Sequence, residues 1–150
     1  MDSVDLQVLR TTSSWIKEGH GVVLGTIVET FGSSPRPPGA MLGIRDDGLV
    51  AGSVSGGCVE DDLIAKIRDN SLDISLPKMT IYGVTKEEAE RYGLPCGGTL
   101  KIILEQIASR SKVDALLAKI EKQELVTRRL ELSTGEVRLE PATPTDELTF

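Results

Sequence analysis

Segments typical of strands and of helices alternate along the first 108 residues of this 150-residue chain. The run 21–30 is apolar and rich in β-branched residues, which predicts a buried strand. Before it, apolar residues at helical spacing predict a helix from Asp2 or Ser3 to about Lys17, ended by Gly19. The other expected elements are strands at 41–45, 49–54, 79–82 and 99–107 and helices at 58–70 and 85–92. This alternation favours a compact domain of the mixed α/β class with glycine-rich loops.

The remainder of the chain has a different pattern. Residues 111–122 form an amphipathic pattern that predicts a helix, and the segments 125–132 and 136–140 predict a hairpin around Thr134 and Gly135. We expect residues 1–108 to form the α/β domain, residues 109–140 to form a helix and β-hairpin extension packed on it, and residues 141–150 to form a linker or tail.

Composition excludes several classes of function. The net charge of −6 and the aromatic content of 3% argue against a nucleic-acid partner. No apolar run reaches the roughly 18 residues that span a bilayer, and the acidic N-terminus lacks the basic start of a signal peptide. We therefore expect a cytoplasmic protein without a membrane partner, in which the two cysteines are thiols rather than a disulfide.

Both cysteines adjoin a pair of glycines, in Ser55-Gly56-Gly57-Cys58 and in Pro95-Cys96-Gly97-Gly98. Glycines let a backbone approach a ligand closely, and a glycine-rich turn between a strand and a helix start forms an anion site. The helix start favours the thiolate of Cys58, whereas Glu60, Asp61 and Asp62 oppose it. In the alternative interpretation the glycines only permit tight packing and both cysteines are buried and inert. The two motifs together predict one pocket that combines anion binding with sulfur chemistry.

A third candidate is the loop Ser33-Ser34-Pro35-Arg36-Pro37-Pro38-Gly39. Its prolines stiffen the backbone, so Arg36 and the two serine hydroxyls are held in place at little entropic cost. A pre-organised arginine suits bidentate recognition of a phosphate. The alternative is a rigid connector with a solvated arginine.

Other chemistries lack the residues they require. His20 is the only histidine and adjoins two glycines, which is typical of a capping or surface residue. With no close pair of ligands, His20, Cys58 and Cys96 do not form a zinc set, and no Ser/His/Asp arrangement is evident. Neither GxGxxG nor GxxxxGK[ST] is present. We interpret Glu60-Asp61-Asp62 as acidic residues that stabilise a helix start.

Together, residues 26–41 (TIVETFGSSPRPPGAM), 51–60 (AGSVSGGCVE) and 94–99 (LPCGGT) resemble the XdhC/CoxI family of xanthine dehydrogenase accessory proteins. The similarity covers about residues 21–106. It implies a chaperone that transiently binds the molybdenum cofactor (molybdopterin), promotes replacement of a molybdenum oxygen by sulfur, and delivers the cofactor to an apo-hydroxylase. Implied partners are apo-xanthine dehydrogenase or a related molybdenum hydroxylase, and a cysteine desulfurase. Many relatives continue into a C-terminal Rossmann-like domain, which we expect to be absent from this chain.

The resemblance gives each candidate residue a role. Backbone contacts would come from Ser55, Gly56, Gly57, Gly97 and Gly98, and phosphate or pterin contacts from Ser33, Ser34 and Arg36. Cys58 and Cys96 would face the metal, as ligands or as sulfur carriers, because molybdenum is thiophilic. No general acid or base is evident, so an accessory role is favoured over a conventional enzyme. The alternatives are a thiol-dependent sulfurtransferase or oxidoreductase, and a docking module for the apo-hydroxylase without cofactor binding; homo-oligomerisation stays open.

Overall fold

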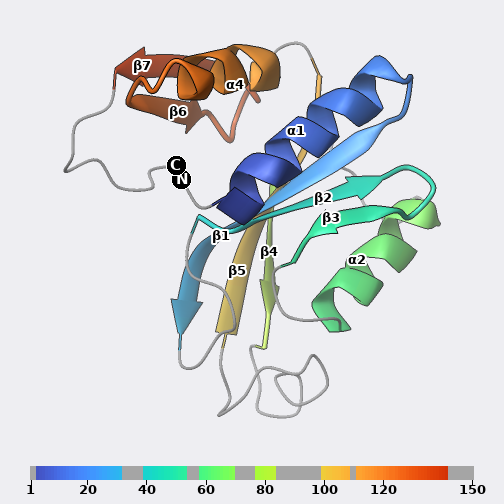
Figure 1. The fold of residues 1–150 in the computed structure, drawn as a ribbon. Coiled ribbons are helices and arrows are strands. Elements are labelled where there is room, and N and C mark those ends of the chain that lie inside the picture. The colour runs from blue at the N-terminus through green and yellow to red at the C-terminus, as the bar shows by residue number, and fades with distance from the viewer. Residues whose placement is uncertain are drawn as a thin grey trace.

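The computed structural model describes residues 3–31, 39–53, 58–69, 77–83, 99–108 and 111–141. They form a five-stranded antiparallel sheet in the order β3-β2-β1-β5-β4, with helices on both faces, and a separate two-stranded sheet of β6 and β7 (Figure 1). The helices are α1 (Ser3–Lys17), α2 (Cys58–Arg68) and α4 (Val113–Glu121). The strands are β1 (Val22–Phe31), β2 (Met41–Arg45), β3 (Val50–Gly52), β4 (Lys78–Tyr82), β5 (Thr99–Gln106), β6 (Val126–Leu130) and β7 (Val137–Pro141). The predicted mixed α/β class is confirmed.

Helix α1 begins and ends where the sequence pattern predicts. Its apolar residues Val8, Leu9 and Trp15 are buried against the sheet, as expected from their helical spacing. Gly19 stops the helix two residues after Lys17: its φ of 92° is readily adopted by glycine, and its N–H donates to the carbonyl of Ile16.

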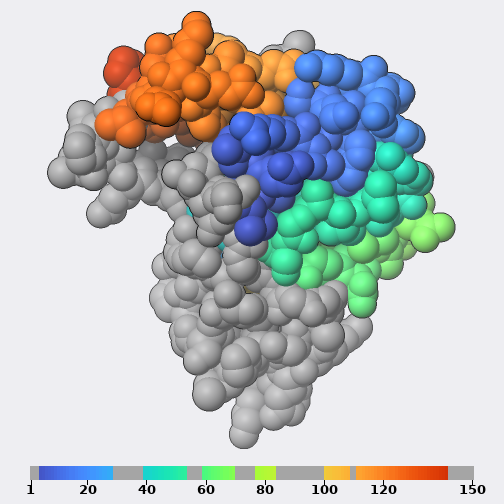
Figure 2. Space-filling view, in the orientation of Figure 1, coloured from blue at the N-terminus to red at the C-terminus, as the bar shows by residue number. Residues whose placement is uncertain are grey.

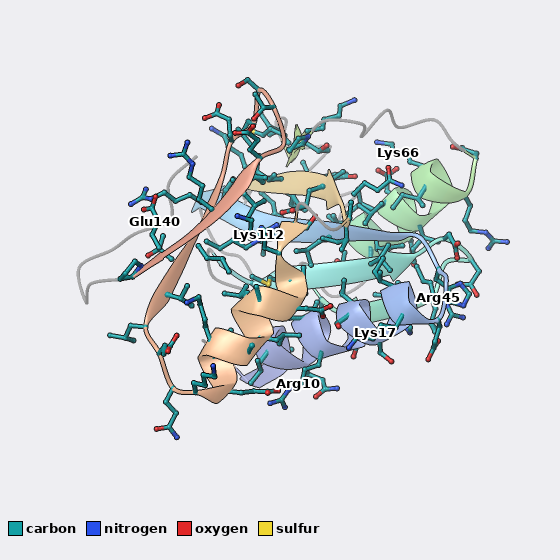
Figure 3. All side chains as sticks on the ribbon, turned by 90° about the horizontal axis from the view of Figure 1, so that it is seen from above. Arg10, Lys17, Arg45, Lys66, Lys112 and Glu140 are labelled. Carbon is teal, nitrogen blue, oxygen red and sulfur yellow. The ribbon has the colours of Figure 1, made fainter. Side chains whose placement is uncertain are left out.

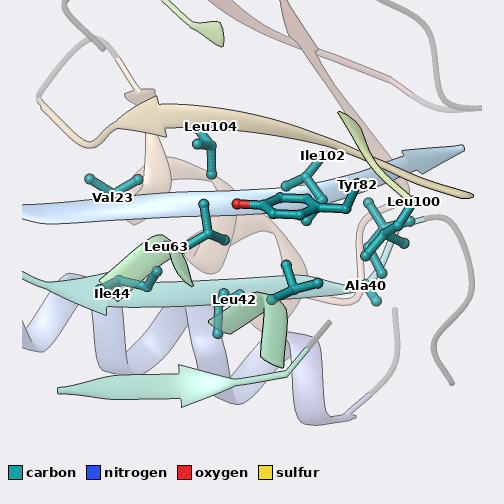
Figure 4. Packing of buried hydrophobic residues seen from close by; sticks show 11 residues of the cluster. Val23, Ala40, Leu42, Ile44, Leu63, Tyr82, Leu100, Ile102 and Leu104 are labelled. Atoms are coloured by element: carbon teal, nitrogen blue, oxygen red, sulfur yellow. The ribbon is translucent and has the colours of Figure 1, made fainter. Parts of the chain in front are cut away.

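The two faces of the sheet bury alternate residues of β1. Val23 and Ile27 belong to a cluster that also contains Val59 and Leu63 of α2. Figure 4 shows residues of this cluster from β2, β4 and β5 around Leu63. Val22 and Leu24 belong to a second cluster with residues of α1 and α4. Because side chains alternate along a strand, one apolar run serves both layers of helices.

The predicted helix at 111–122 and hairpin at 125–140 are present as α4 and as β6 with β7. Helix α4 lies alongside α1, where the Ser13 hydroxyl donates a hydrogen bond to the Asp114 carboxylate (Figure 3). In the space-filling view, α4 and the hairpin of β6 and β7 lie beside α1 on the same side of the molecule (Figure 2). The division of the chain into a domain, an extension and a tail stays a prediction.

Strand β3 is shorter than predicted, because it ends at Gly52 rather than at residue 54. The φ of Gly52 is 82°, which is outside the extended region and therefore ends the strand. The predicted helix at 85–92 lies outside the described residues. Among the helices of the described segments, none is long and apolar enough to cross a membrane.

Candidate functional site

The strands that border the candidate loops share one end of the sheet. Phe31, the last residue of β1, pairs with Thr99, the first residue of β5. Tyr82, the last residue of β4, pairs with Leu100. Strands β1 and β4 therefore end where β5 begins, as Figure 1 shows. The chain therefore leaves the sheet here before residues 32–38, and it both leaves and re-enters the sheet here on either side of residues 84–98.

The glycine-rich segment 54–57 is bordered at the same end, but further back along β1. Met41, the first residue of β2, pairs with Thr26, and Leu42 pairs with Gly52, the last residue of β3. Thr26 lies five residues before Phe31, which corresponds to about 15 Å along the strand. The residues that border all three candidate segments thus lie toward one end of the sheet. Those that border residues 54–57 lie further from the end of β1 than Phe31 and Thr99 do.

Three hydrogen bonds fix the point where the chain returns from residues 32–38. The Gly39 N–H donates to the Ile27 carbonyl (2.7 Å), and the Ile27 N–H donates to the Ala40 carbonyl (2.9 Å). The Met41 N–H donates to Oδ1 of Asp5 in α1 (2.9 Å), and the Asp5 side chain is buried. Because an acidic residue in the first turn of a helix is common, the sequence alone did not reveal this anchoring role.

The chain enters the glycine-rich segment through a crowded turn at Gly52. A Cβ atom on Gly52 would lie 2.5 Å from Cγ2 of Val8 and 2.6 Å from the carbonyl oxygen of Met41. Only glycine fits here, since the contact with Met41 is to the backbone. The first two turns of α1 therefore contact both the end of one candidate loop and the start of another.

The structure describes little of the predicted site itself. The residues Ser33, Ser34, Arg36, Ser55, Gly56, Gly57, Cys96, Gly97 and Gly98 lie outside the described residues. Cys58 is the first residue of α2, so the predicted helix start immediately after the glycine pair is present. That these residues form one pocket stays a prediction.

The acidic run after Cys58 is engaged within the fold. Glu60 is buried, and Asp62 accepts hydrogen bonds from the Tyr82 hydroxyl (2.7 Å) and from Nζ of Lys66 (2.9 Å). The described residues contain no group of three or more His, Cys, Asp or Glu side chains that could hold a metal ion.

His20 lies at the opposite end of the sheet, beside the start of β1. Its Nδ1 is 3.1 Å from Oδ1 of Asp46, whose Oδ2 accepts the Gly21 N–H (3.0 Å). This partly exposed pair joins the end of α1 to the turn between β2 and β3, which agrees with the predicted capping or surface role.

The Asp46 carboxylate makes stability depend on pH. The hydrogen bonds from Gly21 and His20 lower the pKa of Asp46 below its ordinary value. A lowered folded-state pKa contributes stability above the unfolded value of about 4, and this contribution is lost as pH falls through the folded value. We expect the free energy of unfolding, measured with urea, to fall as the pH is lowered below about 5. Asp46→Asn should flatten that slope, and an unchanged slope would contradict the assignment.

This protein is a mixed α/β domain, and the strands that border its glycine-rich segments meet at one end of the sheet. Residues 15–73 match the model of the XdhC and CoxI family, a range that contains two of the three candidate loops. The chain is 31% identical over 131 residues to the molybdenum cofactor insertion chaperone PaoD of Escherichia coli strain K12, covering 81% of this chain and 38% of that protein. It is 30% identical over 100 residues to a protein of Bacillus subtilis strain 168 described as a probable subunit of xanthine dehydrogenase, covering 65% and 30%.

A solved structure shares the fold. The crystal structure of a xanthine dehydrogenase from Bacillus halodurans superimposes with a TM-score of 0.67 at 26% identity, covering 89% of this chain and 40% of that one. This chain is therefore similar to the XdhC and CoxI family, whose model it matches over residues 15–73, and it spans 30–40% of the length of these relatives.

Proposed function

We propose that this chain binds the molybdenum cofactor as cargo and is part of a chaperone that inserts the cofactor into a xanthine dehydrogenase-type hydroxylase. The relatives' names support this function, because one is a molybdenum cofactor insertion chaperone and another a probable subunit of xanthine dehydrogenase. The observation that carries the proposal is that the borders of all three candidate segments lie at one end of the sheet.

The proposed site uses different groups for the two ends of the cargo. The backbone amides of Ser55, Gly56, Gly57, Gly97 and Gly98 bind its anionic part, helped by the N-terminal end of α2. Arg36 binds the phosphate, with Ser33 and Ser34 as further hydrogen-bonding groups for the phosphate or pterin.

Cys58 and Cys96 face the molybdenum in this proposal, because soft thiolates suit a thiophilic metal. Binding is transient, since the cargo must leave for the apo-hydroxylase. A cysteine desulfurase supplies the sulfur that replaces a molybdenum oxygen while the cofactor is held. We place the protein in the cytoplasm, where the thiols stay reduced.

Cofactor retention tests this function. The pure chain is mixed anaerobically with free molybdenum cofactor and desalted, and bound molybdenum and the fluorescence of the oxidised pterin are measured. We expect near-stoichiometric retention by the natural sequence and by His20→Ala, the control at the opposite end of the sheet. Cys58→Ser and Cys96→Ser should each weaken the affinity for the cofactor about tenfold, which corresponds to a loss of about 1.4 kcal/mol of binding free energy, and should thereby lower the retained fraction.

Two other outcomes of the retention assay would each contradict a different part of the proposal. Full retention by both cysteine variants would leave the chaperone function standing and remove the metal-facing role of the thiols. No retention by the natural sequence would contradict cofactor binding by this chain and favour a docking module.

A further inference from the structure

Strand β4 lies at one edge of the five-stranded sheet. It is the last strand in the order β3-β2-β1-β5-β4, and β5 is the only described strand that pairs with it. It contains neither proline nor glycine, and Lys78 is its only charged residue. Edge strands usually carry charges, prolines or bulges that prevent pairing with another chain. With a single charge at its first residue, β4 has little of this protection.

The backbone groups of Met79 and Ile81 point away from the sheet. In β5 the Ile107 N–H donates to the Val22 carbonyl (2.9 Å), so the backbone groups of Ile107 face β1. Backbone groups alternate in direction along a strand, so those of the even-numbered residues of β5 face β4. Even-numbered residues of β4 pair with them. The N–H and carbonyl groups of Met79 and Ile81 therefore face outward.

The side chains of the same two residues are apolar and exposed. Tyr82 points toward Leu63 of α2 on one face of the sheet (Figure 4). Since side chains alternate along a strand, Met79 and Ile81 lie on the other face, where they are 41% and 42% exposed. No other helix or strand of the described segments carries two exposed large apolar residues. Single exposed apolar residues are ordinary, whereas neighbouring ones beside outward backbone groups favour the addition of a strand.

Strand β4 is complementary to a second copy of itself. In an antiparallel pair with a two-fold axis at Thr80, Met79 lies opposite the partner's Ile81 and Ile81 opposite the partner's Met79. These are hydrogen-bonded pairs, so the outward N–H and carbonyl groups of both residues are bonded in each copy. Their four apolar side chains form one cluster across the axis. A shift of two residues in either direction would pair only one of the two residues with a residue of β4.

We propose that β4 is a dimer interface, through which two copies of this chain join their sheets into one continuous antiparallel sheet. The occupant of this edge is a second copy because the outward groups of Met79 and Ile81 match those of the same strand turned about a two-fold axis. A five-residue strand is a small contact beside the roughly 800 Å² that each partner contributes to a standard interface. The dimer is therefore weak and reversible, and it does not depend on cofactor binding.

An introduced cysteine tests both the surface and the register. In a Cys58→Ser, Cys96→Ser background, Thr80→Cys places one cysteine of each copy at the two-fold axis. Residues opposite each other in a non-hydrogen-bonded pair have Cα atoms about 4.5 Å apart, within the range of a disulfide. We expect a disulfide-linked dimer on treatment with oxidised glutathione. Met79→Cys is the matched control, because the two Met79 positions lie diagonally, about 7–8 Å apart, and should link at least about tenfold more slowly.

Sedimentation equilibrium of the natural sequence measures the association itself. The mass should rise from the 16.2 kDa of one chain toward twice that value as the concentration increases from about 10 μM to about 1 mM. Ile81→Lys should keep the chain monomeric over this range, because it places two ammonium groups in the apolar cluster. Leu125→Lys makes the same kind of change at a residue outside β4 that is 68% exposed, and it should leave association unchanged.

Two results would overturn the proposal. If the natural sequence stays monomeric throughout and Thr80→Cys links no faster than Met79→Cys, a second copy is not the occupant, and an extended segment of another protein would be the alternative. If the chain dimerises equally well with Ile81→Lys, the contact lies on another surface. Neither result bears on cofactor retention, which is measured separately.

Discussion

Arg128→Leu should lower the free energy of unfolding by about 3–5 kcal/mol, because it leaves a buried carboxylate without its partner. The Arg128 guanidinium binds Glu105 of β5 through two hydrogen bonds, Nη1 to Oε2 (3.0 Å) and Nη2 to Oε1 (2.5 Å). Its Nε donates to the carbonyl of Ser111 (3.0 Å). The Glu105 side chain is 5% exposed and that of Arg128 is 14% exposed. Urea unfolding measures the loss.

The neighbouring residue offers a matched control. Arg129 contacts Glu140 at 2.5 Å, but both side chains are exposed, at 46% and 39%. An exposed ion pair contributes about 0–1 kcal/mol, so Arg129→Leu should change stability by no more than this. The double variant Glu105→Leu with Arg128→Met should recover much of the loss, because it removes both buried charges. Equal effects of Arg128→Leu and Arg129→Leu would contradict the importance of burial.

The elements were predictable because their signals are local. The stripe of Val8, Leu9 and Trp15 located α1, and the apolar run after Gly21 located β1, each within a residue or two. The order of the strands was not predictable, since the paired residues of β1 and β5 lie 68 to 83 positions apart in the chain and no local pattern records that pairing.

The long-range polar pairs of the fold were also not apparent from the sequence. The Asp62–Tyr82 pair spans 20 positions and the Glu105–Arg128 pair spans 23. One signal was available, because Glu105 is an acidic residue in the apolar strand 99–107 and a buried carboxylate requires a partner. The identity of that partner depended on how the hairpin packs on β5. The glycine and cysteine motifs indicated which residue types form a candidate site. Only the pairing of the strands shows that the residues bordering these motifs lie toward the same end of the sheet.

Gly52→Ala should destabilise the chain by about 3 kcal/mol, from about 1 kcal/mol of backbone strain at positive φ and about 2 kcal/mol of overpacking. The added Cβ would lie 2.5 Å from Cγ2 of Val8 and 2.6 Å from the Met41 carbonyl oxygen. Since Gly52 leads into the segment that ends at Cys58, the same change should weaken cofactor retention at temperatures where the variant is folded. Urea unfolding and the retention assay check the two effects.

Gly19→Ala is the control that separates strain from crowding. Gly19 has a similar φ of 92°, but a Cβ there would meet no atom within 4 Å. It should therefore cost only the strain, about 1 kcal/mol, and leave retention unchanged. Adding Val8→Ala to Gly52→Ala should not restore stability, because the contact with the Met41 backbone remains and Val8 itself is buried in the core. If Gly52→Ala were as mild as Gly19→Ala, the turn would have room to move. Helix α1 would then not hold the start of the glycine-rich segment in place.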